Sequence, residues 1–272
     1  NLSIMKKAWC IIVVLSFNFL VAQEAKTFNS YATLEGVKTI EIHNNLCVSL
    51  YPSYFYGVQI KGNRILKDII KWEFKNSTLK LYTTQENTLA SNAEIIIYVN
   101  DLKEVKLLDM ASIDTNEKVV TDNFTMYSLD ESYYNLLVDC QNFNLIINGS
   151  STGNIAVEAK NVSIDAKGAS NTSMKLKSNK VNVKQSDKSI VSLNGKTQSL
   201  SATVDNKAQL YAWALLAKDV YLFSSNSEDI KVFAEDRLKI NGQGSGKIYV
   251  TGNPKQIDTI NLNKKTKIYY GL

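Results

Sequence analysis

The chain contains 272 residues, of which 44% are hydrophobic, with only two prolines and twelve glycines, and this composition excludes a disordered chain. Its 31 lysines and arginines and 26 acidic residues give a formal net charge of +5, a mild excess. Acidic residues are interleaved with the lysines, so we do not expect a nucleic-acid-binding face, which would need clustered basic residues beside stacking aromatics. We expect the nearest approach to a basic cluster to keep a sheet face soluble and to prevent edge pairing; it consists of Lys175, Lys177, Lys180, Lys184 and Lys188.

Residues 5–22 have the pattern of a secretory signal peptide, with a basic start at Lys6 and Lys7, a short apolar run and a small residue, Ala22, at its end. Cleavage after Ala22 would lower the net charge to +3, which is 29 − 26. Cys10 lies inside the apolar run rather than after it, which argues against a lipid anchor. No later stretch approaches 18 continuous apolar residues, so no transmembrane helix is predicted in the mature chain. We therefore expect an exported protein, located in the periplasm, at the outer-membrane surface or outside the cell.

Between residues 35 and 100, short apolar runs alternate with turn signals such as Asn44-Asn45. Residues 65–74 are compatible with a short helix or with another strand. The strands predicted in this block are 37–42, 46–50, 58–60, 79–82 and 95–99. We expect the block to form irregular first coils and to cap one apolar end of a repeat array, because such arrays need a non-standard closing unit.

Downstream of this block, the sequence repeats with a period of about 19 residues. Each repeat begins with an apolar residue, a residue that is mostly polar, and a second apolar residue, which is the alternation of a strand with one buried face. The starts follow one another at a constant step as far as Leu200 and at slightly varying steps afterwards: Val105, Phe124, Phe143, Val162, Val181, Leu200, Val220, Leu238 and Ile260. Such a period indicates one structural unit stacked on copies of itself.

Six residues after most starts comes a glycine, an asparagine or an aspartate. These residue types adopt positive φ at low cost, so the column predicts a tight left-handed turn in each repeat. The predicted turn column is Asp130, Gly149, Gly168, Asp187, Asn206, Asn226 and Gly244. Each repeat would then contain a strand, the tight turn, a second strand and a return loop.

A repeat this short leaves no room for a crossover helix, so equivalent strands are expected to stack in parallel. The predicted fold is an all-β, two-sheeted parallel β-helix with about 19 residues per coil and an irregular β-rich N-terminal cap. We expect one domain over residues 35–256, with irregular coils at 35–100 and repeats at 101–256. A final strand pair is expected at 257–272, following a turn at Asn253-Pro254.

Few residues could support catalysis. His43 is the single histidine, so neither a histidine-rich zinc site nor a Ser-His-Asp triad can form, and we expect a turn-side surface residue. No phosphate loop, nucleophile elbow or CxxC pair is present, and no metal or cofactor is expected. Asp130, Asp187 and Asp205 fall near the turns, where a structural role explains them. An acidic cluster with a basic partner in one outer groove would instead favour a polysaccharide lyase or hydrolase.

Two further groups of residues leave alternatives open. Cys47 and Cys140 either form a disulfide or act as two small buried hydrophobic residues. Several aromatic residues either lie on a binding surface or belong in part to the core. They are Tyr51, Tyr54, Phe55, Tyr56, Tyr133, Tyr134, Tyr211, Trp213 and Tyr221.

The strand-rich start, with the segments 46–50 and 62–66, runs into coils that turn at triplets such as Gly244-Ser245-Gly246, followed by a segment that ends at Pro254. Over about residues 35–256 this pattern resembles the putative auto-transporter adhesin, head GIN domain family of Bacteroidota. The resemblance implies a right-handed β-helix of pectin-lyase-like shape, no retained catalytic residues, a role in adhesion, and a trimeric assembly.

We therefore expect a non-enzymatic, exported cell-envelope protein that acts as an adhesin-like binding module or as a structural module. Its surface ligand would be a glycan or a protein. The alternative is a carbohydrate-binding or carbohydrate-active β-helix protein.

Overall fold

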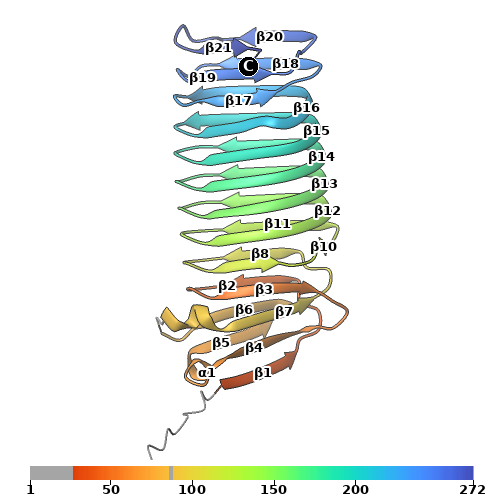
Figure 1. Ribbon diagram of the computed structural model, residues 1–272, viewed down its shortest axis with the longest axis vertical. Coiled ribbons are helices and arrows are strands. Elements are labelled where there is room, and N and C mark those ends of the chain that lie inside the picture. Colours follow the sequence, from red (N-terminus) through yellow and green to blue (C-terminus); the bar gives the residue numbers. More distant parts are fainter. Residues whose placement is uncertain (1–26, 86–87, 272) are drawn as a thin grey trace, which may run out of the picture.

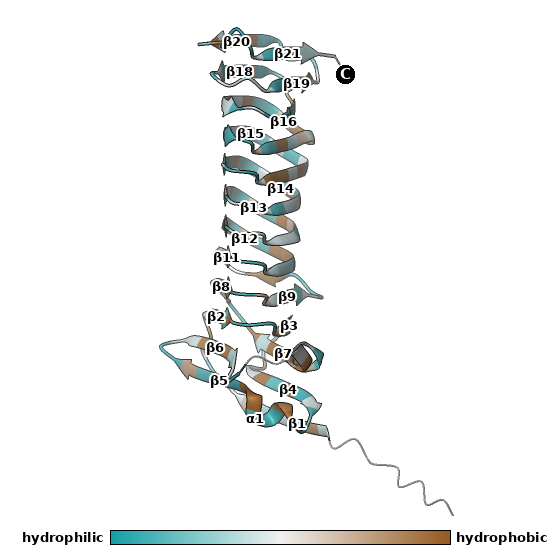
Figure 2. Ribbon diagram, turned by 90° about the vertical axis from the view of Figure 1, so that its left-hand side faces the viewer, coloured by the Kyte–Doolittle hydropathy of each residue, from teal (hydrophilic) through white to brown (hydrophobic). Residues whose placement is uncertain are grey.

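The computed structural model describes residues 27–85 and 88–271, so the predicted signal peptide at 5–22 lies outside the described residues. The protein is nearly all β, with 67% strand and 3% helix, and forms a β-solenoid of about 9 turns with about 19 residues per turn. Figure 1 shows these coils stacked along the long axis, and Figure 2 shows that the strands form two layers. The predicted β-helix is confirmed.

Parallel strands stack into two sheets, and each strand pairs with its equivalent in the next coil. We call the layer nearer the viewer in Figure 1 the front sheet and the other layer the back sheet. The short strands of the front sheet are β3 (Cys47–Pro52), β7 (Glu94–Val99), β9 (Ser112–Thr115), β10 (Val119–Val120), β17 (Ile230–Phe233), β19 (Lys247–Thr251) and β21 (Lys267–Tyr270). Those of the back sheet are β2 (Thr39–Ile42), β6 (Thr78–Thr83), β8 (Glu104–Leu107), β11 (Asn123–Ser128), β18 (Arg237–Gly242) and β20 (Gln256–Ile260).

Five long strands form the middle of the rod and belong to both sheets. They are β12 (Tyr133–Ile147), β13 (Thr152–Ala166), β14 (Asn171–Gln185), β15 (Ile190–Asn206) and β16 (Gln209–Asn226). In β13 the alternation of buried and exposed residues is interrupted by two successive exposed residues, Lys160 and Asn161, and the strand bends there from the front sheet to the back sheet. The predicted return loop is therefore wrong in these coils, because a corner within a continuous strand replaces it.

The tight turns lie at the opposite edge of the rod from these bends (Figure 1). Asp130, Gly149, Gly168, Asp187 and Asn206 have φ values between 60° and 82°. The same conformation occurs in the earlier turns at Asn44 and Asp109, which the sequence period did not include.

The last two residues of the predicted turn column depart from it, because neither Asn226 nor Gly244 has a positive φ. Asn226 is instead buried, and its side chain donates hydrogen bonds to the carbonyl oxygens of Ala208 at 3.2 Å and Glu228 at 2.7 Å. Gly244 is required for space, since a Cβ there would collide with the carbonyl oxygen of Asn226.

The core is a continuous apolar layer between the two sheets, built from the inward residues of every coil. Phe124 and Phe143 stack inside it with ring centroids 5.9 Å apart. At the turn edge the layer becomes narrow, and a column of buried serines from successive coils fills it: Ser132, Ser151, Ser170 and Ser189. Small side chains fit there, and a hydroxyl can bond to the adjacent turn, as Ser189 Oγ does to the Ser186 carbonyl oxygen at 2.8 Å.

The N-terminal cap closes one end of the rod with antiparallel pairings. Its elements outside the solenoid are β1 (Thr27–Thr33), β4 (Gly57–Asn63), the helix α1 (Leu66–Ile69), β5 (Ile70–Lys75) and the 3₁₀ helix η1 (Thr88–Asn92). Strand β4 pairs antiparallel with both β1 and β7, and β5 pairs antiparallel with β6. The segment 65–74 thus contains both a helix and a strand, while β1 lies before the predicted start of the domain at residue 35.

The first coils do not stack in chain order. Strand β2 lies between β6 and β8, and β3 lies between β7 and β9, so the coil formed first in the chain is second in the stack. The sequence period did not indicate this order.

Two predicted repeat starts are out of register. Val105 pairs with Met126 rather than with Phe124. At the other end Leu238 pairs with Ile257 and not with Ile260. Strands β20 and β21 stack in parallel on β18 and β19, so the last strand pair is a further coil of the same solenoid.

Candidate binding site on the front sheet

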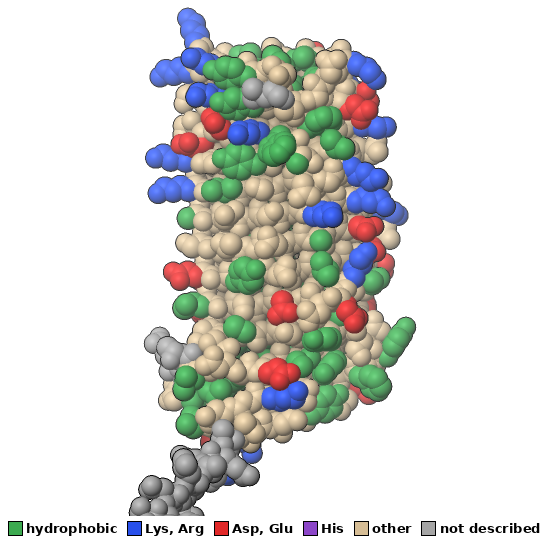
Figure 3. All heavy atoms as spheres, in the orientation of Figure 1, with side chains coloured by type: hydrophobic (Ala, Val, Ile, Leu, Met, Phe, Trp, Pro, Cys, Tyr) green, Lys and Arg blue, Asp and Glu red, His purple; other side chains and the backbone are tan. Residues whose placement is uncertain are grey.

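Aromatic side chains gather on the outer face of the front sheet toward its C-terminal end. Strand pairing brings Tyr211, Lys231, Tyr249 and Tyr269 into one column on β16, β17, β19 and β21. Trp213 lies two residues from Tyr211 on the same outer face and is 57% exposed. We call Tyr211, Trp213, Tyr249 and Tyr269 the aromatic strip. Figure 3 looks onto this sheet and shows hydrophobic side chains gathered in its upper part with a basic side chain among them.

A β-bulge places Trp213 on the surface. Between β15 and β16, Ser192 pairs with Tyr211 and Asn194 pairs with Ala214, so one extra residue is present in β16. Trp213 and Ala214 then follow one another on the outer side, between the buried residues Ala212 and Leu215. Because of this extra residue, the repeat step before Val220 is longer than the steps before it. Bulges commonly redirect a side chain at binding and active sites.

Lys231 lies between two rings of the aromatic strip. Its Nζ is 5.5 Å from the centroid of the Tyr211 ring and 5.7 Å from that of Tyr249. Tyr249 and Tyr269 stack with centroids 5.1 Å apart and an interplanar angle of 17°. These contacts hold the rings in a row and place a positive charge within it.

A shallow hollow of about 570 Å³, which we call the sheet hollow, lies beside the aromatic strip on β12 to β16. Leu137 and Ala156 are outward residues of its lining, and Leu216, which is 56% exposed, lines the part nearest Trp213. Its charged lining residues are Lys118, Glu158, Lys175, Lys177 and Lys196. The hollow thus combines an apolar surface with a largely basic margin.

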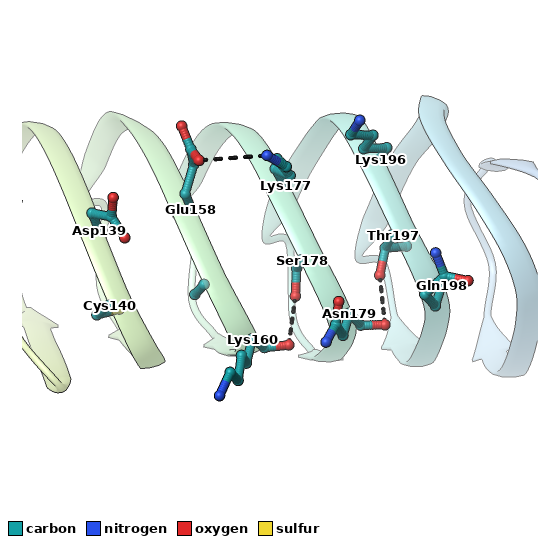
Figure 4. A pocket seen from close by; sticks show the side chains of 11 residues that line it. Asp139, Cys140, Glu158, Lys160, Lys177, Ser178, Asn179, Lys196, Thr197 and Gln198 are labelled. Atoms are coloured by element: carbon teal, nitrogen blue, oxygen red, sulfur yellow. Dashed lines mark hydrogen bonds and ion pairs between the residues drawn. The ribbon is translucent and has the colours of Figure 1, made fainter.

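A row of charged residues separates the sheet hollow from a second hollow of about 320 Å³ at the bend of the coils. The row, which we call the charged ridge, consists of Asp139, Glu158, Lys177 and Lys196 in pairing positions on four successive strands. Figure 4 shows the ridge above the corner residues of the second hollow, where Ser178 Oγ donates to the Lys160 carbonyl oxygen at 3.1 Å and Thr197 Oγ1 donates to that of Asn179 at 3.2 Å.

Lysines neutralise both carboxylates of the charged ridge. Lys118 Nζ lies 3.5 Å from Asp139 Oδ2 and 3.3 Å from Glu158 Oε1, and Lys177 Nζ lies 3.8 Å from Glu158 Oε2. The hydrogen bond to Glu158 raises the pKa of Lys118 above its ordinary value. Beneath the ridge, burial and the charge of Asp139 raise the pKa of the Cys140 thiol to about 11, so this thiol is protonated at neutral pH and unreactive.

The aspartates considered from the sequence do not lie at these hollows. Asp187 Oδ2 accepts a hydrogen bond from the Gly168 N–H at 3.1 Å, and Asp130 Oδ2 accepts one from the Asp109 N–H at 3.2 Å. Asp205 accepts a hydrogen bond from Ser225 in the following coil. All three aspartates accept hydrogen bonds at the turn edge of the rod, which is opposite the bends.

His43 directly follows β2 at the turn before Asn44, on the turn side as expected, and it is half-buried. Its Nε2 is 2.6 Å from Glu41 Oε1, and its Nδ1 is 3.8 Å from Asp109 Oδ2. Burial raises the pKa of Glu41, but the hydrogen bond from His43 and the charges of His43, Lys80 and Lys106 outweigh burial and leave it below its ordinary value. Among residues 27–85 and 88–271, no group of three His, Cys, Asp or Glu side chains is arranged to hold a metal ion.

The predicted aromatic residues and cysteines separate into different environments. Tyr54 and Phe55 are 90% and 77% exposed in the loop between β3 and β4, at the N-terminal cap, and Tyr221 lies on the back sheet. Tyr134 is fully buried, which corrects its inclusion among surface candidates. Cys47 is exposed and Cys140 is buried, and both are free.

Sequence reasoning missed Lys231, Tyr249, Tyr269 and the charged ridge. Aligning the outward residue of each repeat would have placed the first three in one column with Tyr211. Predicting the charged ridge from the sequence would have required the positions of the bends, because each bend interrupts the alternation of buried and exposed residues. The five predicted basic residues also separate, since Lys175 and Lys177 lie on the front sheet and Lys184 lies on the back sheet.

Among solved structures, the fold is similar to a putative adhesin from Parabacteroides distasonis, with a TM-score of 0.66 and 14% identity over 91% of this chain and 98% of that one. A putative adhesin from Parabacteroides merdae aligns with a TM-score of 0.64 and 13% identity over 92% and 98% of the two chains. A structure from Parabacteroides distasonis named a putative lipid binding protein aligns with a TM-score of 0.55 and 14% identity over 92% and 98%. At these identities the likeness shows the fold alone. No curated protein matches the sequence significantly.

In the part of the chain that the structure describes, every helix is too short or too polar to cross a membrane. The family model for the putative auto-transporter adhesin, head GIN domain, matches residues 37–171 and 150–254. These matches cover most of the chain, from the first coils to the turn after β19. The chain belongs to the putative auto-transporter adhesin, head GIN domain family.

Proposed function

We propose that this protein is an exported, non-enzymatic binding module of the cell envelope, and that its aromatic strip binds a glycan. The observation that carries the proposal is the row of four outward aromatic rings on β16, β19 and β21 of the front sheet, with Lys231 on the coil between β16 and β19. The signal-peptide pattern of residues 5–22 supports export, and the family description supports adhesion.

The physical basis is the match between sugar rings and flat aromatic surfaces. A pyranose ring has an apolar face that packs on an aromatic ring, while its hydroxyl groups bond to polar neighbours. Adjacent strands are about 4.8 Å apart, so the rings on β16, β19 and β21, with Lys231 between the first two, form a platform along the rod rather than a single contact point. A parallel solenoid holds this platform rigid without further support.

The test is a glycan-binding screen on the mature chain, residues 23–272. Trp213→Ala and Tyr249→Ala should each weaken binding by about tenfold, which is the loss expected when a stacking contact of about 1.4 kcal/mol is removed. Tyr221→Ala is the matched control, since Tyr221 is 40% exposed but lies on the back sheet. Equal losses in all three variants, or no glycan binding by the wild type, would refute the proposal.

A carbohydrate-active enzyme is the second candidate, because the charged ridge brings Asp139 and Glu158 together with Lys118 and Lys177 beside two hollows. This is the acidic and basic arrangement that polysaccharide cleavage requires. The binding proposal predicts that no polymer is shortened, with or without Ca²⁺, in a polysaccharide degradation assay. Turnover that disappears in Glu158→Gln would establish the enzymatic alternative.

A further inference from the structure

Three lysines that lie at the sheet hollow or within the aromatic strip have no acidic partner. Among residues 27–85 and 88–271, no carboxylate oxygen lies within 4.0 Å of the Nζ of Lys175, Lys196 or Lys231. Lys177 and Lys118, by contrast, pair with the carboxylates of the charged ridge. Lys247 and Lys267, which are exposed two residues before Tyr249 and Tyr269, likewise have no carboxylate within 4.0 Å among the described residues, so unpaired positive charge runs from the sheet hollow along the aromatic strip.

These lysines and the aromatic strip lie on successive coils of the front sheet, with Lys175 two residues and Lys196 four residues along their strands from the positions in register with Tyr211. Lys175 is on β14, Lys196 on β15, Tyr211 and Trp213 on β16, Lys231 on β17, Tyr249 on β19 and Tyr269 on β21. These strands pair in this order and belong to six successive coils. Five steps of about 4.8 Å make a track of about 24 Å, long enough for several sugar units of an extended polymer.

We propose that the ligand is an acidic polysaccharide that lies along this track, with sugar rings on the aromatic strip and carboxylate or sulfate groups at Lys175, Lys196 and Lys231. This inference rests on the proposed function and specifies its ligand class. The part of the polymer that extends beyond Trp213 lies in the sheet hollow.

Lys231 carries the strongest part of this argument. Its ammonium group lies between two tyrosine rings, so an anion bound there would contact the charge while the neighbouring sugar stacks on a ring. A neutral polymer would gain the stacking contacts alone and would leave three unpaired lysines without a charged partner. Electrostatic complementarity of this kind determines which ligand is chosen more than how tightly it binds.

The experiment compares two polymers that differ only in charge, polygalacturonate and its fully methyl-esterified form, on the mature chain 23–272. We expect the acidic form to bind at least about tenfold more tightly, and its affinity to fall as NaCl is raised from about 0.05 M to about 0.5 M. Alginate, hyaluronan and heparin serve as further acidic probes, since they present different spacings of negative charge.

The decisive variant is Lys175→Gln/Lys196→Gln/Lys231→Gln, which should lose most of the preference for the acidic form and much of the salt dependence, since only Lys247 and Lys267 remain unpaired beside the strip. Its control, Lys184→Gln/Lys207→Gln/Lys239→Gln, removes the same total charge from the back sheet and the turn edge and should leave both intact. Thermal unfolding verifies that both variants fold.

The outcomes separate this inference from the proposed function. Equal affinity for the charged and esterified polymers, or an unchanged preference in the front-sheet variant, overturns the acidic-ligand inference while glycan binding stands. Absence of binding to every acidic polymer, with binding to neutral glycans, overturns it as well. Absence of binding to any glycan refutes the proposed function.

Discussion

Tyr134 shows how one residue spans several coils of the solenoid. Its side chain is fully buried, and its hydroxyl group hydrogen-bonds to Thr172 Oγ1, two coils further along the axis. The residue between them in the stack is Gly153, where a Cβ would collide with both Cδ2 and the carbonyl oxygen of Tyr134. Only glycine therefore fits at position 153.

We predict that Gly153→Ala lowers the free energy of unfolding by about 1–3 kcal/mol, because the added methyl group overpacks the core. Gly62→Ala is the control, since its Cβ would lie 3.4 Å from its nearest neighbour, the flexible Leu66 side chain, and should change stability by less than about 0.5 kcal/mol. Urea denaturation followed by circular dichroism measures both. Equal stability of the two variants would contradict the packing argument.

Single residues also show what pattern reasoning can recover. The conformation of Asp130, Gly149, Gly168, Asp187 and Asn206 follows from residue type and spacing, because few residue types tolerate positive φ. The same reasoning misassigned Asn226 and Gly244. Asn226 is held by buried hydrogen bonds, one of them to the Ala208 carbonyl oxygen of the preceding coil, and Gly244 is required by its closeness to the backbone of Asn226; both of these contacts join residues about one coil apart in the sequence.

At the scale of elements, the extra residue in β16 forms a bulge, and this bulge places the side chain of Trp213 on the surface. Deletion of Trp213 would restore the regular repeat step between Leu200 and the residue that is now Val220. We predict that this deletion keeps the far-ultraviolet circular dichroism of the wild type and abolishes glycan binding, because the uninterrupted strand no longer has the extra outward residue.

The comparison variant for this deletion is Trp213→Ala, which keeps the bulge and removes the ring. It should weaken glycan binding by about tenfold while keeping its thermal midpoint close to that of the wild type. A deletion variant that unfolds, or that still binds glycan, would show that the bulge has another role.

Arg237 on β18 links to Asp219 on β16 through two hydrogen bonds, from Nε to Oδ1 at 2.9 Å and from Nη2 to Oδ2 at 2.8 Å. The hydrogen bond from Arg237 lowers the pKa of Asp219 below its ordinary value of 3.8. A carboxyl group whose pKa is lowered by folding stabilises the native state above its ordinary pKa, and this contribution is lost as pH falls through the lowered value.

We therefore predict that Asp219→Asn destabilises the protein at pH 7, and that the difference from the wild type shrinks as pH falls below 3.8. Thermal unfolding of both proteins over a pH series measures this difference. Lys184→Gln is the control, because Lys184 is exposed and forms no ion pair with any residue that the structure describes. A difference that stays constant down to pH 2 would contradict the assignment, since at about that pH most paired carboxyl groups are protonated.

At the scale of the whole molecule, the two ends of the rod differ. The N-terminal end is covered by the antiparallel strands β1, β4 and β5, and its coils stack out of chain order. At the other end, β20 pairs only with β18, β21 pairs only with β19, and every residue of β20 is exposed, within the described residues.

In a solenoid, stability is close to a sum over coils and their nearest neighbours, so a coil with one neighbour opens most easily. We predict that amide hydrogens of β20 and β21 exchange first and those of β12 to β15 last in native-state hydrogen exchange. The middle strands, which have neighbours on both sides, provide the internal control. Uniform protection along the rod would indicate a single cooperative unit instead.

The sequence alone determined the fold class, the coil length and most of the turns, because a solenoid repeats one local pattern and each coil must bury the same face. It also identified the family. Tertiary structure decided the order of the first coils, the register of Val105 and Ile257, and the bends inside β12 to β16. It alone brought Lys175, Lys196 and Lys231 onto one sheet face with the aromatic strip, since these positions depend on pairing between separate strands of the chain.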